Sequence, residues 1–192
     1  MCGRYLIDDD TYAGVWLLLN TPGKVNDIHK GEVFPTNTAP VITRDGAVNV
    51  KWGFPHWKNS GVIINARAET ALAKNMFRNP LLERRCVIPS GGFYEWDRTG
   101  TLKKKDKYLF RFSGAGFLCM AGMFSVFRDA SGSEYSAFVI LTTEANDSVA
   151  PIHDRMPVIL APDEYDLWIA DSEFMEYVLR RPGPALCAER AD

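Results

Sequence analysis

The chain has 192 residues, of which 46% are hydrophobic and 24% are charged, and its formal net charge is −2. This composition is typical of a soluble globular domain. A chain of this length can bury roughly two thirds of its surface and needs no disulfide bonds to fold. Because the net charge is slightly negative, no overall field attracts nucleic acid, and any DNA binding must depend on a local basic groove.

The cysteines and histidines argue against a zinc site. Cys2, Cys86, Cys119 and Cys187 form no C-x-x-C pair, and the three histidines are scattered, so the standard zinc spacings are absent. Four cysteines without a secretory leader fit a reducing compartment, and apolar runs such as 138–141 are too short to span a membrane. We therefore expect a monomeric cytoplasmic protein with no metal, no cofactor and no membrane association.

Sequence periodicity predicts one helix and several strands in the first half of the chain. Tyr12, Val15, Trp16 and Leu19 lie at helical spacing after Asp10, which is a capping residue. Strands are expected at 3–7, 47–52 and 62–64, a loop at 24–40, and a short helix at 70–77 that ends before Pro80.

The second half is rich in strands and ends in helices. Five strands separated by turn residues are expected at 85–88, 93–96, 108–112, 117–127 and 135–143, another at 156–160, and helices at 163–170 and 173–181. The strand at 135–143 is apolar on both faces, which predicts a central position, and Lys103-Lys104-Lys105 is typical of a solvated hairpin tip. This order predicts an α+β fold, a single domain over residues 1–192 with a mostly antiparallel β core and peripheral helices.

Cys2 is the first candidate for chemistry. Methionine aminopeptidases remove Met1 when the second residue is small, and the mature chain would then begin with an α-amine and a thiol on one residue. An amine with a pKa of about 8 is partly neutral at pH 7, and such a 1,2-aminothiol reacts with an aldehyde to give an imine and then a five-membered thiazolidine. The alternative is a small residue near a frayed terminus.

Three further segments carry polar residues that could act with Cys2. Residues 65–70 (Asn-Ala-Arg-Ala-Glu-Thr) follow an apolar strand and form either a site or the capped start of a helix. Glu95 lies among aromatic residues and either transfers protons or faces outward on its strand. His153 precedes a strand and is either catalytic or structural, while Arg155 binds phosphate or pairs with Asp154.

The joint pattern is more specific than any single motif. The segments occur in the following order: Met-Cys-Gly-Arg at 1–4, Thr-Asn-Thr-Ala-Pro at 36–40, Lys-Trp-Gly-Phe at 51–54, 65–70 as above, Arg-Arg-Cys at 84–86, Gly-Phe-Tyr-Glu-Trp at 92–96, Ala-Gly at 121–122, Thr-Thr and Ala-Asn at 142–146, and His-Asp-Arg-Met-Pro at 153–157. Over roughly residues 2–170 this pattern resembles the SOS response-associated peptidase family, whose members process abasic sites.

The resemblance implies a β-rich fold with a basic groove for single-stranded DNA that contains abasic sites. It implies that Cys2 joins the sugar aldehyde and that Asn65 is the orienting amide of the site. It also implies that Glu95 transfers protons and that His153 assists opening of the sugar ring. By the same resemblance Arg4, Arg67 and Arg155 are expected to contact phosphates, and Pro40, Trp52 and Trp57 to pack against backbone and bases. The family is also credited with autocatalytic release of Met1 and with β-elimination at abasic sites.

The chain departs from the family pattern in three places. The tryptophan–glycine segment 52–57 is compact, Phe124 stands where the family often has tryptophan, and the expected final strand beyond residue 180 is missing. None of these departures affects the proposed catalytic positions.

Two other functions remain open from the residues. A class II glutamine amidotransferase also begins Met-Cys-Gly and uses its N-terminal cysteine as a nucleophile, although its Asn-Gly-Glu segment is not found here. A non-catalytic reader of single-stranded DNA would use the same arginines and tryptophans as a stacking groove.

Overall fold

The computed structural model describes residues 2–19, 30–58, 60–97, 105–113 and 116–191. Its helices are α1 (Asp9–Leu19), α2 (Ala68–Ala71), α3 (Asn75–Glu83), α4 (Tyr165–Ala170) and α5 (Ser172–Val178). Its strands are β1 (Tyr5–Ile7), β2 (Gly31–Val33), β3 (Thr38–Thr43), β4 (Gly46–Trp52), β5 (Phe54–Pro55), β6 (Val62–Ile63), β7 (Asn65–Arg67), β8 (Arg85–Ser90), β9 (Gly92–Trp96), β10 (Lys107–Arg111), β11 (Leu118–Arg128), β12 (Glu134–Glu144), β13 (Arg155–Pro157), β14 (Ile159–Leu160) and β15 (Cys187–Ala191).

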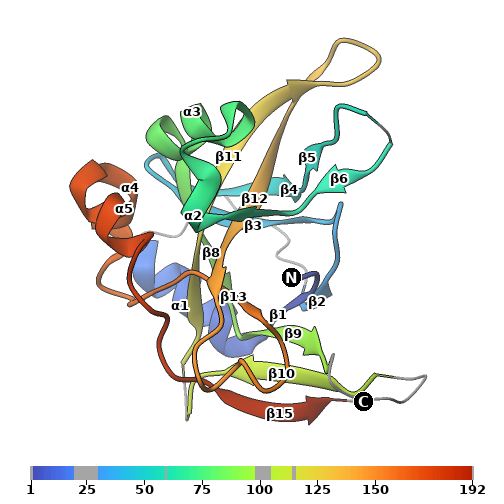
Figure 1. Cartoon of the computed structure of the whole chain (residues 1–192). Helices are drawn as coiled ribbons and strands as arrows, with labels where there is room; N and C mark the ends of the chain where they lie inside the picture. The colour runs from blue at the N-terminus through green and yellow to red at the C-terminus, as the bar shows by residue number, and fades with distance from the viewer. Residues whose placement is uncertain (1, 20–29, 59, 98–104, 114–115, 192) are drawn as a thin grey trace.

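The strands form two main sheets and one small hairpin (Figure 1). The larger sheet has the order β13-β12-β4-β3-β8-β11-β14, with β7 beside β12, and the smaller has the order β15-β10-β9-β1-β2. Because β12 also pairs with β11, strands β12, β4, β3, β8 and β11 form a closed ring. The described pairings are antiparallel except those of β12 with β4 and β7, so the predicted α+β fold with a mostly antiparallel core is confirmed.

Alternate side chains of the larger sheet pack into two different cores. Val87 and Leu141 pack with residues of α3, α4 and α5, while Ile88 and Ile140 pack with Tyr5 and other residues of the five-stranded sheet. Successive side chains of a strand point to opposite faces. Both faces of β12 are therefore covered, which confirms the expected central position of residues 135–143.

The first half of the chain contains more regular structure than its sequence predicts. Part of the expected loop at 24–40 forms β2 and the start of β3. The sequence did not predict these strands, because a three-residue strand shows no alternation and Pro40 argues against a strand. Helix α1 is present, but Asp8 caps it instead of Asp10, since the Asp8 carboxylate accepts a hydrogen bond from the Thr11 N–H at 2.9 Å. The side chains of residues 15–19 and the predicted stop at 21–23 lie outside the described residues.

The predicted helix at 70–77 is two helices, and Pro80 does not end the second. The break falls between α2 and α3, and Pro80 lies inside α3, whose last turn is closed by the Arg84 N–H donating to the Pro80 carbonyl at 2.8 Å. The single strand expected at 156–160 is likewise divided into β13 and β14.

The expectation that the chain lacks its final strand is wrong. Strand β15 pairs along its whole length with β10. Its residues 187–190 are exposed, so main-chain hydrogen bonds hold the strand in the sheet. The sequence therefore has no apolar alternation there that would predict a strand. At the predicted hairpin tip, Lys105 is exposed, and Lys103 and Lys104 lie outside the described residues. Within the described ranges no helix is long and apolar enough to cross a membrane.

Candidate active site at the N-terminal cysteine

Cys2 is fully buried just before β1, at the contact between the two sheets. Its thiol donates to the Arg4 carbonyl at 3.7 Å, and the side-chain amide of Asn65 donates to the Cys2 carbonyl at 2.9 Å. Asn65 begins β7, so a strand of the larger sheet holds a residue that lies just before the first strand of the smaller one. Burial, and next the charge of Glu95, raises the pKa of the Cys2 thiol well above its ordinary value.

Glu95 and His153 form a buried pair beside this residue. The imidazole Nε2 lies 3.4 Å from a Glu95 carboxylate oxygen, and each side chain is no more than 4% exposed. Strand alternation places Glu95 on the same face as Phe93, which packs in the core with Tyr5 and Cys2. The choice that the sequence left open is therefore decided, because Glu95 faces inward.

The other nitrogen of the His153 ring is held by its own segment. The Arg155 main-chain N–H donates to His153 Nδ1 at 3.0 Å, and an Asp154 carboxylate oxygen lies 3.2 Å from the same atom. Such fixed partners set the orientation of an imidazole and thus which nitrogen faces the reacting group. In this structure Nε2 is the nitrogen directed at Glu95.

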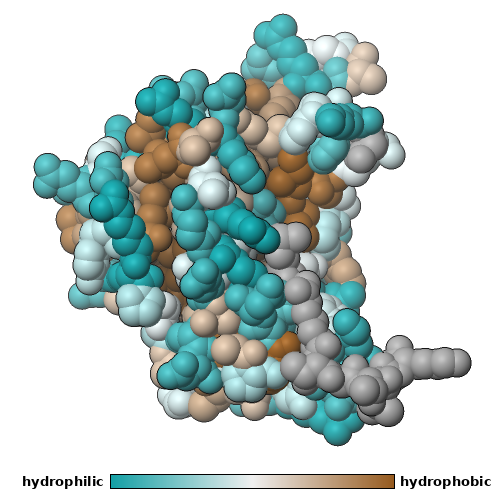
Figure 2. Space-filling view, viewed as in Figure 1, coloured by the Kyte–Doolittle hydropathy of each residue, from teal (hydrophilic) through white to brown (hydrophobic). Residues whose placement is uncertain are grey.

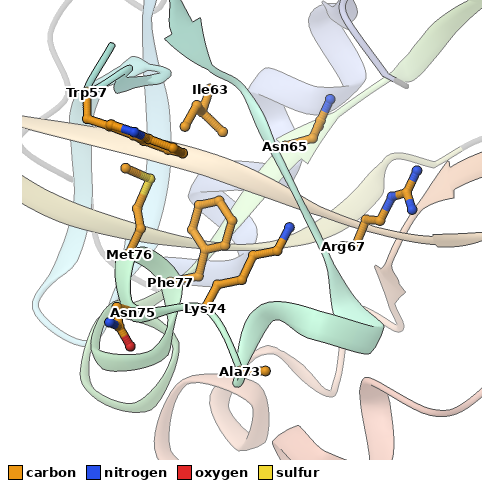
Figure 3. Close-up of a pocket in the computed structure, with 9 residues that line it drawn as sticks. All are labelled: Trp57, Ile63, Asn65, Arg67, Ala73, Lys74, Asn75, Met76 and Phe77. Atoms are coloured by element: carbon orange, nitrogen blue, oxygen red, sulfur yellow. The ribbon is translucent and has the colours of Figure 1, made fainter.

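A pocket of about 670 Å³ is lined in part by Asn65. Its lining residues are Trp57, Ile63, Asn65, Arg67, Ala73, Lys74, Asn75, Met76 and Phe77 (Figure 3). The close-up shows the large apolar side chains gathered on one side, Asn65 and Arg67 on the other, and the Lys74 ammonium between them. Figure 2 shows hydrophobic residues over α3 and beside the β5–β6 hairpin, surrounded by hydrophilic ones.

Two of the six residues predicted to contact DNA lie at this pocket. Trp57 is 68% exposed, with its ring stacked on His56 at 4.6 Å between centroids, and Arg67 is exposed. Arg4 is elsewhere, because its guanidinium pairs with Glu32 at 3.0 Å and lies over the rings of Phe34 and Trp96.

The structure places the remaining three away from the surface. Trp52 is 0% exposed, packs against Tyr5 and Phe138, and donates its indole N–H to the Ile64 carbonyl. Pro40 is buried in β3. In this structure Trp52 and Pro40 therefore present no accessible face to a base, which corrects the expectation that they pack against DNA: Trp52 is on the buried side of β4, whose other side is exposed, and Pro40 is within the buried part of β3.

Arg155 is also buried, and its guanidinium makes two parallel hydrogen bonds to Glu69 at 2.8 and 2.9 Å. The two guanidinium nitrogens that were expected to bind phosphate are thus hydrogen-bonded to a carboxylate. The sequence suggested a pairing of Arg155 with Asp154 as the alternative, but the partner in the structure is Glu69. Sequence spacing could not show this, because the partners are 86 residues apart.

Sequence reasoning also missed Lys74 and Glu69. Lys74 is a single cation between Ala73 and Asn75, and no motif singles it out. Glu69 lies inside the 65–70 segment, but its position in the first turn of α2 equally fits a favourable helix-dipole interaction. Across the described residues no group of three or more potential metal ligands is present.

Comparisons with known proteins identify the family of the chain. The model of the SOS response associated peptidase family matches residues 1–184. Two Bacillus subtilis proteins named abasic site processing protein, YoaM and YoqW, are 35% and 34% identical; the matched regions cover 88% and 79% of this chain and 79% and 75% of those proteins. A crystal structure of a Bacteroides thetaiotaomicron protein has the same fold, with a TM-score of 0.83 at 24% identity over 100% of this chain and 92% of that one. The chain belongs to the SOS response associated peptidase family.

Proposed function

We propose that this protein processes abasic sites in single-stranded DNA by joining Cys2, once Met1 is removed, to the sugar aldehyde as a thiazolidine. The observation that carries the proposal is the position of Cys2, which Asn65 holds beside the buried Glu95–His153 pair. Relatives at about one third identity are named abasic site processing proteins, which supports the substrate.

The free α-amine is the first nucleophile in this scheme. The raised pKa of the thiol keeps it protonated at neutral pH, whereas an α-amine with a pKa of about 8 is partly neutral. The amine adds to C1′ of the ring-opened sugar, and the carbinolamine loses water to give an imine. His153 and Glu95 are placed to move the protons that sugar opening and loss of water require.

Ring closure then uses the thiol of the same residue. The sulfur adds to the imine carbon, the thiol proton passes to the imine nitrogen, and the overall change is aldehyde plus aminothiol to thiazolidine plus one water. Asn65 Oδ1 is buried and has no hydrogen-bond partner in the described part of the chain. It is therefore an open acceptor for an N–H formed during this sequence.

The same imine permits β-elimination. Removal of a C2′ proton lets the 3′ phosphate leave and breaks the strand, and the buried Glu95–His153 pair supplies candidate bases for this step. Self-catalysed release of Met1 would use the same groups, with Asn65 holding the Cys2 carbonyl in place. Both activities belong to the proposal.

The pocket beside Asn65 supports single-stranded DNA as the ligand. Trp57 offers an exposed aromatic face, and Arg67 and Lys74 supply positive charge next to it. Stacking on aromatic side chains with cations along the backbone is the usual way to bind single strands without sequence preference.

The proposal is tested with abasic single-stranded DNA and a denaturing gel. Wild-type protein should give a denaturant-stable adduct, and Cys2→Ala should give none while it still binds DNA. Cys2→Ser keeps the amine and should be trapped only when borohydride reduces the imine. A stable adduct of Cys2→Ala without reductant would contradict the assignment.

A matched pair of tags tests the need for a free amine. An N-terminal extension turns the Cys2 nitrogen into an amide that cannot form an imine, so this protein should bind DNA without cross-linking, whereas a C-terminal tag should have no effect. Intact-mass spectrometry confirms which chains begin at Cys2. Adduct formation by chains verified to keep the extension would exclude the aminothiol mechanism.

A further inference from the structure

Both terminal nitrogens of the Arg155 guanidinium are hydrogen-bonded inside the protein, while its Nε is buried without a hydrogen-bond partner among the described residues. Besides its two bonds to Glu69, the guanidinium donates to the Thr142 carbonyl at 2.6 Å, and the side chain is 9% exposed. Burial opposes ionisation of Glu69, but the hydrogen bonds from Arg155 outweigh it and lower the pKa of that carboxyl. The pair is therefore ionised at neutral pH and clamps the start of β13 to the start of α2.

This clamp is directly connected to the catalytic histidine. Arg155 is two residues after His153, and its main-chain N–H is the donor to His153 Nδ1. Moving the Arg155 backbone would move that donor and turn the ring away from Glu95. One short segment, residues 65–69, thus fixes both halves of the site, because Asn65 holds Cys2 and Glu69 holds the His153 segment.

We infer that Glu69 is a positioning residue for the reaction, which acts through Arg155 to hold His153 against Glu95. The inference rests on the proposed function for its kinetic readout only. The charged groups that face His153 are Glu95 from β9 and Asp154 from its own segment, and neither is altered by a change at Glu69.

The test compares Glu69→Gln with a matched control. Glu164 and Arg181 form a second two-pronged carboxylate–guanidinium pair, at 2.6 and 2.5 Å, on another part of the molecule. Glu69→Gln should lower the maximal single-turnover cross-linking rate by up to about 100-fold, because a misplacement of about 1 Å in the site can cost that much. The DNA concentration giving half the maximal rate should stay the same, and Glu164→Gln should change neither value.

An NMR titration gives a readout that needs no DNA. The chain has three histidines, so their ring C–H signals are assignable by substitution. The titration midpoint of His153 should shift in Glu69→Gln and stay at the wild-type value in Glu164→Gln. If the wild-type protein forms no adduct, the proposed function fails, and this titration still decides the positioning role.

The competing role for Arg155 predicts the opposite result. If Arg155 binds phosphate, Glu69→Gln frees it, so affinity for single strands should rise and the salt slope should steepen by about 0.7 with an unchanged His153 midpoint; that outcome overturns the inference. Should Glu69→Gln fail to fold, Arg155→Lys keeps the charge but loses the two-pronged geometry. A folded Arg155→Lys protein with the wild-type rate and midpoint would equally overturn it.

Discussion

At the scale of single residues, the proposed chemistry of Cys2 depends on two neighbours with different effects. Asn65 fixes the residue, while burial and the Glu95 charge keep its thiol protonated. A protonated thiol leaves the amine to react first and places a proton acceptor beside the sulfur for ring closure. The raised pKa is thus compatible with an ordered reaction in which nitrogen precedes sulfur.

Glu95→Gln should therefore change two rates in opposite directions. Cross-linking should slow by about 10²- to 10⁴-fold, the usual cost of removing a general acid or base. Alkylation of the processed Cys2 by iodoacetamide should become faster at a fixed pH, because the pKa falls when the carboxylate charge is removed, although burial still holds it above normal. Peptide mass mapping measures the alkylation.

Cys119 is an internal control for that experiment. Burial alone raises the pKa of Cys119 to about 12, so its alkylation should not respond to Glu95→Gln. Faster labelling of both cysteines would indicate a loosened fold instead of a changed charge.

At the scale of elements, one buried arginine joins two helices to the sheet. Arg85 begins β8 and donates to the carbonyls of Leu81 and Leu82 at the end of α3, and of Trp168 and Ile169 at the end of α4. The last carbonyls of a helix have no partner within the helix and carry partial negative charge. Arg85 satisfies two helix ends at once and sets α3, one wall of the pocket, against β8.

Arg85→Leu should lower the free energy of unfolding by about 2–4 kcal/mol, because it leaves buried carbonyls without donors. Urea denaturation followed by tryptophan fluorescence gives the value. Arg180→Leu is the control, since Arg180 is 79% exposed in its pair with Glu176 and exposed pairs contribute little. Equal stability of Arg85→Leu and wild type would show that water replaces these bonds.

At the scale of the whole molecule, the net charge of −2 means that the proposed DNA binding must depend on a local surface. Most described arginines are paired with carboxylates, including Arg4, Arg155 and Arg181. Arg67 and Lys74 line the pocket. The affinity of the proposed DNA-binding surface should therefore depend on few cations.

Arg67→Gln should reduce the salt slope for undamaged single-stranded DNA by about 0.7, the contribution of one phosphate contact. Binding should weaken similarly for different sequences, because phosphate contacts carry no base information. Fluorescence anisotropy over a range of salt concentrations measures both. Arg128→Gln, on the exposed β11–β12 hairpin, removes the same charge from a residue that does not line the pocket and should leave the slope unchanged. Equal losses in the two variants would rule out a local site.

The sequence by itself determined the fold class, the central strand at 135–143 and the family, because apolar alternation and the order of short motifs are local properties of the chain. It also named Cys2, Asn65, Glu95 and His153, which the structure brings together. Short elements escaped it, since β2 is too brief to show a period and β15 is held by main-chain bonds alone.

Only the tertiary structure decided which charged and aromatic side chains are accessible. Trp52 and Trp57 lie in the same sequence segment, yet one is in the core and the other projects over the pocket, because strand β4 ends between them. Arg67 and Arg155 are the same residue type, but the guanidinium of Arg155 is hydrogen-bonded to Glu69, which lies 86 positions away in the sequence. Burial and ion pairing depend on what the fold places next to a side chain, and that information is absent from the residue itself.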